Sequence, residues 1–273
     1  MKLSLAIQTP EVDGLFPFAL LSGSFEEKLE KAAGFGAQGV ELITVDPRSL
    51  KVESIHMLLQ KNGLEASAIA SGGLGFALGI NLLNADPGKA ALAKRRLFDL
   101  IDFASAVGAP VVTIGGLRGR LAWAGSSGKE LLVVILREAG DYAGKKNIHL
   151  ALEPLNRYET DFIYNVKEGL AFIEEVAQPS LGLLLDTYHV NFEESSWTQP
   201  FRHALAAGKL FHVHLGDNNR LPPGDGLIDF RAIVTTLREG GYTGYMSAEL
   251  LPHPDPDTAA QRTLVYMQSI LEK

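Results

Sequence analysis

IHLALEP, residues 148–154, is the stretch of sequence from which the fold can be worked out: a short Leu-rich run that ends in Glu153 and a proline. Short runs of this kind are typical of β-strands. Seven further short runs, rich in Leu or in β-branched residues, occur along the chain and alternate with longer helical patterns. The eight candidate strands are residues 3–9, 38–43, 65–70, 110–116, 148–154, 181–186, 210–216 and 245–250.

Strands that alternate with helices imply parallel pairing through right-handed crossovers. The helical patterns include residues 24–36 and 87–108, which both end in Gly, the residue that tolerates the left-handed stop of a helix. Eight strand–helix units of about 34 residues each predict one (β/α)8 TIM barrel that spans residues 1–273 as a single domain. The structural alternative is an open, doubly wound sheet.

Composition narrows the classes of function. The net charge of −7 and the sequence pI of about 5.5 disfavour general binding to nucleic acid. The densest basic cluster, KRR at residues 94–96, falls inside a helical pattern and is interpreted as a solvated helix face. Because the chain has no cysteine, disulfides, thiolate metal sites and a cysteine nucleophile are excluded.

Targeting and membrane signals are missing from the sequence. The first ten residues, MKLSLAIQTP, hold an apolar run too short for the core of a signal peptide. No run approaches the roughly 20 apolar residues of a membrane span. We therefore expect a cytoplasmic protein without a membrane partner. Residues 71–86, SGGLGFALGINLLNAD, are Gly-rich and apolar, and they are expected to form either a lid over the barrel mouth or a packed loop.

Side chains that are able to bind a metal ion stand at the ends of the last four candidate strands, at Glu153, Asp186, His214 and Glu249. They are 33, 28 and 35 residues apart, close to one strand–helix unit each time. In a (β/α)8 barrel these strand ends form the active-site face, so the four side chains should meet at one height. Three carboxylates and one imidazole predict one divalent metal ion, Mn²⁺ first, with Mg²⁺ or Co²⁺ as alternatives. Taken singly, each residue could equally be a cap or an ion-pair partner.

The alternation of side chains along a strand agrees with this arrangement. If Glu153 and Asp186 point into the barrel, so do Ala151 and Leu184, while the leucines between them face the helices. In the seventh strand, His212 shares the inner face with the predicted histidine ligand but lies deeper. It is interpreted as a structural residue, or as a support for the ligands, before a ligand itself.

Several stretches of the sequence resemble the xylose-isomerase-like family of sugar isomerases and epimerases. Within that family they look most like the ketose 3-epimerases and, more narrowly, the 5-keto-L-gluconate epimerase type. The resemblance is carried by LEPLNRYETDFIYN (152–165), LLDTYHVNFEE (184–194), FHVHLGDNNRLPPGDGLIDF (211–230) and SAELLP (247–252), with MKLSLAIQT (1–9) and GGLRGR (115–120) in the first half.

The resemblance implies roles for named residues. The four strand-end residues match the metal ligands of the family, and Glu153 and Glu249 also match its acid/base pair. Three further residues match positions that contact substrate: Glu159, His189 and Arg220. The implied reaction is C3-type epimerisation of a keto-sugar or keto-sugar acid, of the 5-keto-L-gluconate or D-tagaturonate type, through an enediolate. Two glutamates on different sides of the substrate can exchange its proton, and a divalent ion can stabilise the negative charge.

Arg118 and Arg120, in the segment that follows the fourth strand, suggest that the substrate is an acid. A guanidinium near the barrel mouth can pair with a carboxylate, which would favour a keto-sugar acid over a neutral ketohexose. The alternative is that both arginines face solvent or a neighbouring subunit, and a homo-oligomer is left open.

Three competing functions remain. An aldose–ketose isomerase, such as hydroxypyruvate isomerase, would use the same metal and enediolate but move the proton between adjacent carbons. A DNA-repair endonuclease on a related barrel needs more His ligands on the early strands, and no His occurs between His56 and His149. A sugar-binding barrel without activity would not need both Glu153 and Glu249 at one metal.

Overall fold

A closed ring of parallel strands forms the centre of the computed structural model, which describes residues 1–14 and 16–272. The strands pair in sequence order, and β8 closes the ring against β1. The strands are β1 (Lys2–Gln8), β2 (Gly39–Ile43), β3 (Glu65–Ala70), β4 (Val111–Ile114), β5 (His149–Leu152), β6 (Leu181–Asp186), β7 (Leu210–Leu215) and β8 (Tyr245–Ala248). All eight predicted strands and the predicted TIM barrel are confirmed, and the doubly wound alternative is wrong.

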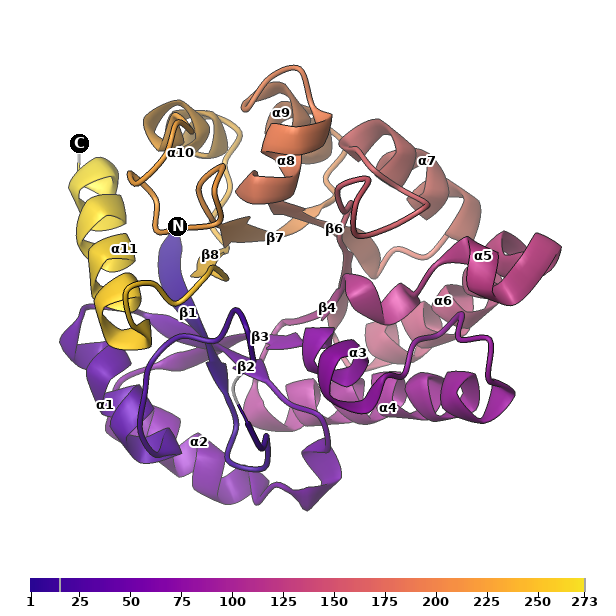
Figure 1. The fold of residues 1–273 in the computed structure, drawn as a ribbon, viewed down its shortest axis with the longest axis horizontal. Coiled ribbons are helices and arrows are strands. Elements are labelled where there is room, and N and C mark those ends of the chain that lie inside the picture. Colours follow the sequence, from indigo (N-terminus) through magenta and orange to yellow (C-terminus); the bar gives the residue numbers. More distant parts are fainter. Residues whose placement is uncertain (15, 273) are drawn as a thin grey trace.

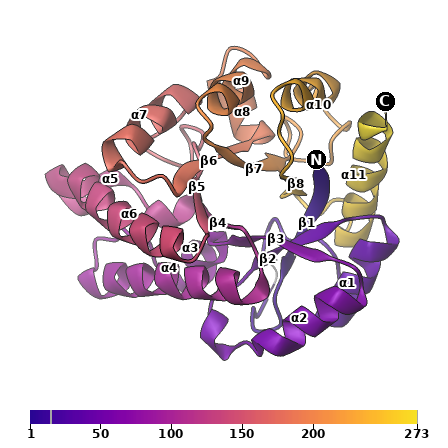
Figure 2. The same cartoon turned by 180° about the vertical axis from the view of Figure 1, so that it is seen from behind.

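Helices surround the ring on its outside, as the views from the two ends show (Figures 1 and 2). They are α1 (Phe25–Gly34), α2 (Val52–Lys61), α3 (Gly72–Leu78), α4 (Pro87–Val107), α5 (Leu121–Ala124), α6 (Gly128–Lys145), α7 (Val166–Val176), α8 (Thr187–Glu193), α9 (Gln199–Ala206), α10 (Phe230–Glu239) and α11 (Pro256–Leu271). Three single 3₁₀ turns cover Pro47–Ser49, Gly116–Arg118 and Gly125–Ser127. Helix α1 starts with a capping box between Ser24 and Glu27, and α4 ends at Gly108, whose φ is 79°.

Buried apolar residues lie on both sides of the strands, as the alternation of side chains along a strand requires. The larger part fills the space between the outer strand faces and the helices and includes Leu150 and Leu152. A smaller cluster inside the barrel contains Ala151 and Leu184, with Ala68 and Val111. The predicted inward and outward faces of β5 and β6 are therefore confirmed, and strand-end side chains that share the inner face must meet at the mouth.

Residues 71–86 are not an irregular loop throughout, because they contain helix α3. The helix ends at Gly79, whose φ of 60° suits glycine. Gly73 lets it pack closely on β2, since a Cβ there would lie 3.2 Å from a methyl group of Ile43. Phe76, on the same helix, lines the cavity at the barrel mouth. Within the part of the chain that the structure describes, no helix is long and apolar enough to cross a membrane.

Candidate active site

Four side chains from the last four strands converge at the carboxyl end of the barrel. Glu153 follows β5, Asp186 ends β6, His214 lies in β7 and Glu249 follows β8. One ligand atom from each lies within 4.8 Å of the others, and all but Glu249 are buried. The Nδ1 atom of His214 is 3.3 Å from Oε2 of Glu249 and 3.9 Å from Oε1 of Glu153. The structure thus brings together the four predicted ligands, which we call the carboxylate–histidine cluster.

Three polar atoms of this cluster have no hydrogen-bond partner among the described residues, and they show whether the cluster suits a cation. Glu153 Oε1, Asp186 Oδ2 and His214 Nδ1 are buried and accept or donate no hydrogen bond within the described residues. Buried polar atoms without partners are costly, and a bound cation would satisfy all three. Three carboxylates and one imidazole form a ligand set that suits Mn²⁺, Mg²⁺ or Co²⁺.

Two carboxylates of the cluster, Glu153 and Asp186, have raised pKa values. Burial raises the pKa of Glu153 well above its usual range, and the neighbouring Glu249 and Asp186 raise it further against the opposing effect of His214. Burial likewise raises the pKa of Asp186 to about 6, although Arg220 and His214 oppose the change. Like charges in a desolvated site resist ionisation, and a divalent cation would offset that repulsion.

His189, at the start of helix α8, is a neutral hydrogen-bond donor that points into the site. Its Nδ1 accepts hydrogen bonds from the main-chain N–H (3.3 Å) and the side-chain amide (2.9 Å) of Asn156, so the proton belongs on Nε2. That Nε2 lies 3.7 Å from Glu153 and 3.9 Å from Asp186. Burial, reinforced by the positive charge of Arg220, lowers the pKa of His189 well below its usual value. A neutral N–H donor in this place can stabilise a developing oxyanion.

Arg220 is fixed between two aromatic rings beside the cluster. Its guanidinium carbon is 3.7 Å from the ring centre of Phe18 and 4.7 Å from that of Tyr188. It donates to Glu159 at 3.1 Å and lies 3.9 Å from Glu249. Its φ of 61° is unusual for a residue with a side chain, and such backbone conformations concentrate at functional sites. The three predicted substrate contacts, Glu159, His189 and Arg220, therefore lie together at the cluster.

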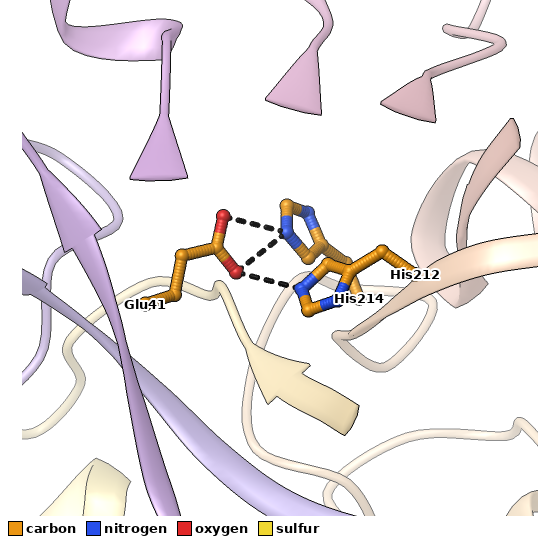
Figure 3. Close-up of side chains that lie close together, drawn as sticks. All are labelled: Glu41, His212 and His214. Atoms are coloured by element: carbon orange, nitrogen blue, oxygen red, sulfur yellow. Dashed lines mark hydrogen bonds and ion pairs between the residues drawn. The ribbon is translucent and has the colours of Figure 1, made fainter. Parts of the chain in front are cut away.

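Two residues of the site were not found from the sequence. Asp217 is fully buried, and its carboxylate accepts hydrogen bonds from the main-chain N–H groups of Gly224, Gly226 and Ile228, which organises the loop that carries Arg220. Glu41, on β2, accepts hydrogen bonds from His212 and from the cluster residue His214 (Figure 3). Its only signal in the sequence is a lone acid in the otherwise apolar strand GVELI.

Arg118 and Arg120 do not line the cavity beside the cluster, because both guanidinium groups donate to main-chain carbonyl groups instead. The predicted pairing of these arginines with a substrate carboxylate is therefore wrong. Arg118 is buried, and its guanidinium donates to the main-chain carbonyl oxygens of Glu153 (2.6 Å) and Phe162 (3.1 Å). Arg120 donates to the carbonyl oxygen of Tyr158 at 3.0 Å. The strand ends at Ile114, and the 3₁₀ turn that follows it directs both arginines toward the segment after β5. The alternative prediction, that both arginines face solvent, is also wrong for Arg118, because this side chain is buried.

A cavity of about 220 Å³ opens at the barrel mouth above the cluster. One wall is polar and includes Glu153, Glu159, His189 and Arg220, and the other is aromatic and is formed by Phe16, Phe18 and Phe76. The three phenylalanine rings pack edge to face, with centroids 5.1–6.0 Å apart. A larger cavity, of about 330 Å³, lies at the other end of the strands, away from the cluster.

Comparisons with known proteins assign this chain to a family. Residues 29–270 match the family described as xylose isomerase-like TIM barrel, and the chain belongs to that family. It is 30% identical to an L-ribulose 3-epimerase of Methylomonas sp. (strain DH-1) over 88% of this chain and 82% of that protein. It is also 30% identical to a ketose 3-epimerase of Arthrobacter globiformis over 79% and 74% of the two chains.

One further relative and one solved structure extend these comparisons. A 3-dehydro-D-guloside 4-epimerase of Escherichia coli (strain K12) is 33% identical over 49% of this chain and 51% of that protein. The fold matches a crystal structure of D-allulose 3-epimerase from Methylomonas sp. with D-allulose, with a TM-score of 0.78 and 24% identity over 98% and 97% of the chains. The resemblance to the family and the expected enzyme class, an isomerase, are thus confirmed at the level of these homologues.

Proposed function

We propose that this protein is a metal-dependent C3-type epimerase of a keto-sugar. The observation that carries the proposal is the meeting of Glu153 and Glu249 at one buried cluster with Asp186 and His214, directly beneath a cavity at the barrel mouth. The similarity to L-ribulose and ketose 3-epimerases supports the same reaction.

The carboxylate–histidine cluster would hold one divalent cation, Mn²⁺ first, with Mg²⁺ or Co²⁺ as alternatives. When bound, the cation supplies Lewis-acid stabilisation of the negative charge that builds on the substrate oxygens as a proton leaves the carbon beside the ketone. His189 donates its Nε2–H toward the same charge. Arg220 and Glu159 form a pair at the cavity wall that can bind substrate hydroxyl groups and orient the sugar.

Glu153 and Glu249 are proposed to move the proton. They follow strands β5 and β8, three positions apart in the ring, so their carboxylates approach the cavity from different sides. One takes the proton from carbon as a general base, which leaves an enediolate. The other returns a proton to the opposite face as a general acid, and the roles reverse in the reverse reaction.

The cavity favours a neutral keto-sugar over a keto-sugar acid. Among the described lining residues, Arg220 is the one cationic side chain, and it is already paired with Glu159. Arg118 and Arg120, which suggested an acid, donate to main-chain carbonyl groups instead. The narrower resemblance to 5-keto-L-gluconate epimerase stays a prediction, as do a homo-oligomeric assembly and a cytoplasmic location.

Deuterium exchange tests the proposal. The metal-loaded enzyme is incubated in D₂O with neutral ketoses, keto-sugar acids and 3-keto-glycosides, and the exchanging carbon is located by NMR. We expect exchange at C3 of a neutral ketose, together with the appearance of its C3 epimer. Exchange with transfer of the carbonyl group to the adjacent carbon would instead identify an aldose–ketose isomerase. No exchange on any substrate would contradict both.

A further inference from the structure

Glu41 lies beneath the carboxylate–histidine cluster and bridges the barrel interior. It belongs to β2, is fully buried, and reaches the two inward histidines of β7 (Figure 3). His212 Nε2 is 2.9 Å from Oε2 of Glu41, while His214 Nε2 is 3.0 Å from Oε2 and 3.1 Å from Oε1. Buried carboxylates are costly without such partners, so the arrangement is stable only as a unit.

The neighbouring strands leave space for this contact. In the sheet register, Glu41 pairs with Ala6 of β1 on one side and Ala68 of β3 on the other, and both alanines are buried. Short side chains at these two positions allow the Glu41 carboxylate to extend across the barrel interior instead of packing against a large neighbour. The layer of inward-facing side chains beneath the cluster therefore leaves room for one acid and for the two histidines that donate hydrogen bonds to it.

The hydrogen bonds determine which nitrogen of His214 carries the proton. An ionised carboxylate only accepts hydrogen bonds, so the Nε2 atoms of His212 and His214 must both donate. In the neutral imidazole, His214 Nδ1 then keeps its lone pair, and this atom lies in the cluster, 3.3 Å from Oε2 of Glu249 and 3.9 Å from Oε1 of Glu153. It is buried and without a hydrogen-bond partner among the described residues.

We propose that Glu41 is a positioning residue, which holds His214 in the tautomer and ring orientation that present Nδ1 to the divalent cation. The inference rests on the metal site of the proposed function. Histidine ligands commonly donate their second N–H to a carboxylate, and loss of that partner typically weakens metal binding 10- to 100-fold. Glu41 itself contacts neither the cavity nor the cluster carboxylates.

A second metal site made of Glu41, His212 and His214 is the competing interpretation, since their ligand atoms also lie close together. Three protein ligands fall short of the four of a closed structural site, and the Glu41 carboxylate already accepts hydrogen bonds from both histidines. His214 Nε2 lies at nearly equal distances from both carboxylate oxygens, as expected for a shared hydrogen bond. The two interpretations differ in the number of ions bound per chain.

Metal titration of the metal-free full-length chain is the first test. Mn²⁺ is titrated into wild type, Glu41→Gln and the control Asp99→Asn, and affinity and stoichiometry are measured together with the fraction folded. Asp99 is a buried carboxylate outside the barrel that pairs with Arg48 and Arg96, so the control removes the same charge far from the cluster. We expect one ion per wild-type chain, a dissociation constant raised 10- to 100-fold in Glu41→Gln, and an unchanged value in Asp99→Asn.

Nitrogen-15 NMR of the histidines, in metal-free protein at a pH where His214 carries no charge, is the second test. In wild type we expect His214 protonated on Nε2 alone, and in Glu41→Gln a mixture of tautomers. If Glu41→Gln does not fold, Glu41→Asp keeps the charge but shortens the side chain by one methylene. It is expected to weaken Mn²⁺ binding too, with normal folding by circular dichroism.

The outcomes separate this inference from the proposed function. Wild-type affinity in a folded Glu41 variant would overturn the inference alone and leave the metal site in place. Two ions per wild-type chain, with one lost in Glu41→Gln, would show that Glu41 is a ligand and would also overturn it. A wild-type chain that binds no divalent ion would overturn the proposed function and this inference with it.

Discussion

The guanidinium of Arg118 donates a 2.6 Å hydrogen bond to the main-chain carbonyl oxygen of Glu153, the residue whose side chain enters the cluster. Arg118 also donates to the carbonyl oxygens of Phe162 and Ile163, so it ties the segment after β5 to the turn after β4. Burial lowers its pKa to about 10, which still leaves it charged at neutral pH. A residue that sequence reasoning assigned to substrate instead supports the backbone of the site.

Arg118→Met should therefore destabilise the protein without changing its preference between acidic and neutral substrates. Several buried carbonyl groups would lose their donor, at a cost of about 3 kcal/mol or more in the free energy of unfolding. Urea titration measures that loss, and Arg120→Ala is the control, expected to stay within about 1 kcal/mol because its contact is more exposed. A selective rise in KM for keto-sugar acids in Arg118→Met would contradict the structural role.

Glu153→Gln and Glu249→Gln should each nearly abolish epimerisation. Loss of general acid/base catalysis costs on the order of 10²–10⁴-fold in kcat, and a weakened metal site adds to it. Turnover and bound metal are measured on the same samples. Glu65→Gln, at an exposed position on β3, is the control and should retain activity. Near-normal turnover in a variant that keeps its ion would remove that glutamate from the proton path.

Arg220→Lys should lower kcat/KM by about tenfold or more while the protein stays folded. Lysine keeps the charge but cannot stack as a plane between Phe18 and Tyr188, the arrangement that fixes the nitrogen donating to Glu159. Burial opposes the charge of Arg220, yet Asp186 and Glu249 raise its pKa, so the wild-type guanidinium is fully charged. Steady-state kinetics and a thermal melt are the measurements. Unchanged kinetics would show that the stacking of Arg220 between Phe18 and Tyr188 contributes to packing only.

Relative to Asp186→Asn, the metal-free wild-type protein should lose stability as pH rises from 5 to 7. Asp186 titrates at about 6 when folded and near 3.9 when unfolded, so the folded chain holds more protons in this window. The contribution of Asp186 to the free energy of unfolding must then decrease as pH increases through the folded pKa. Glu41 acts in the opposite sense, since its histidine partners lower its pKa against the effect of burial, but its contribution is complete above its usual value of 4.5.

Urea titrations at several pH values check this dependence. Asp186→Asn should flatten the slope, and a saturating divalent cation should reverse it, because protons compete with the ion for the same carboxylates. Equal slopes in the metal-free wild type and in Asp186→Asn would contradict the raised pKa.

Much of the fold followed from the sequence, because the barrel is encoded locally. Short apolar runs alternating with long amphipathic segments allow few arrangements, and regular spacing places Glu153, Asp186, His214 and Glu249 at corresponding strand ends. Strand alternation then determines which residues face inward, as Ala151 and Leu184 show. These features depend on residues close together in the chain.

Contacts between distant segments were decided only by the tertiary structure. Glu41 meets His214 across 173 positions of sequence, and nothing local in GVELI shows that two alanines on neighbouring strands make room for its carboxylate. Arg118 was misassigned for the same reason: a turn after β4 sends its side chain to carbonyl groups more than 30 residues away instead of into the cavity. The spacing of residues in the sequence determines which side chains of each strand lie at the barrel mouth. The partners of a buried charge depend instead on which helices, strands and turns pack around it in the folded chain.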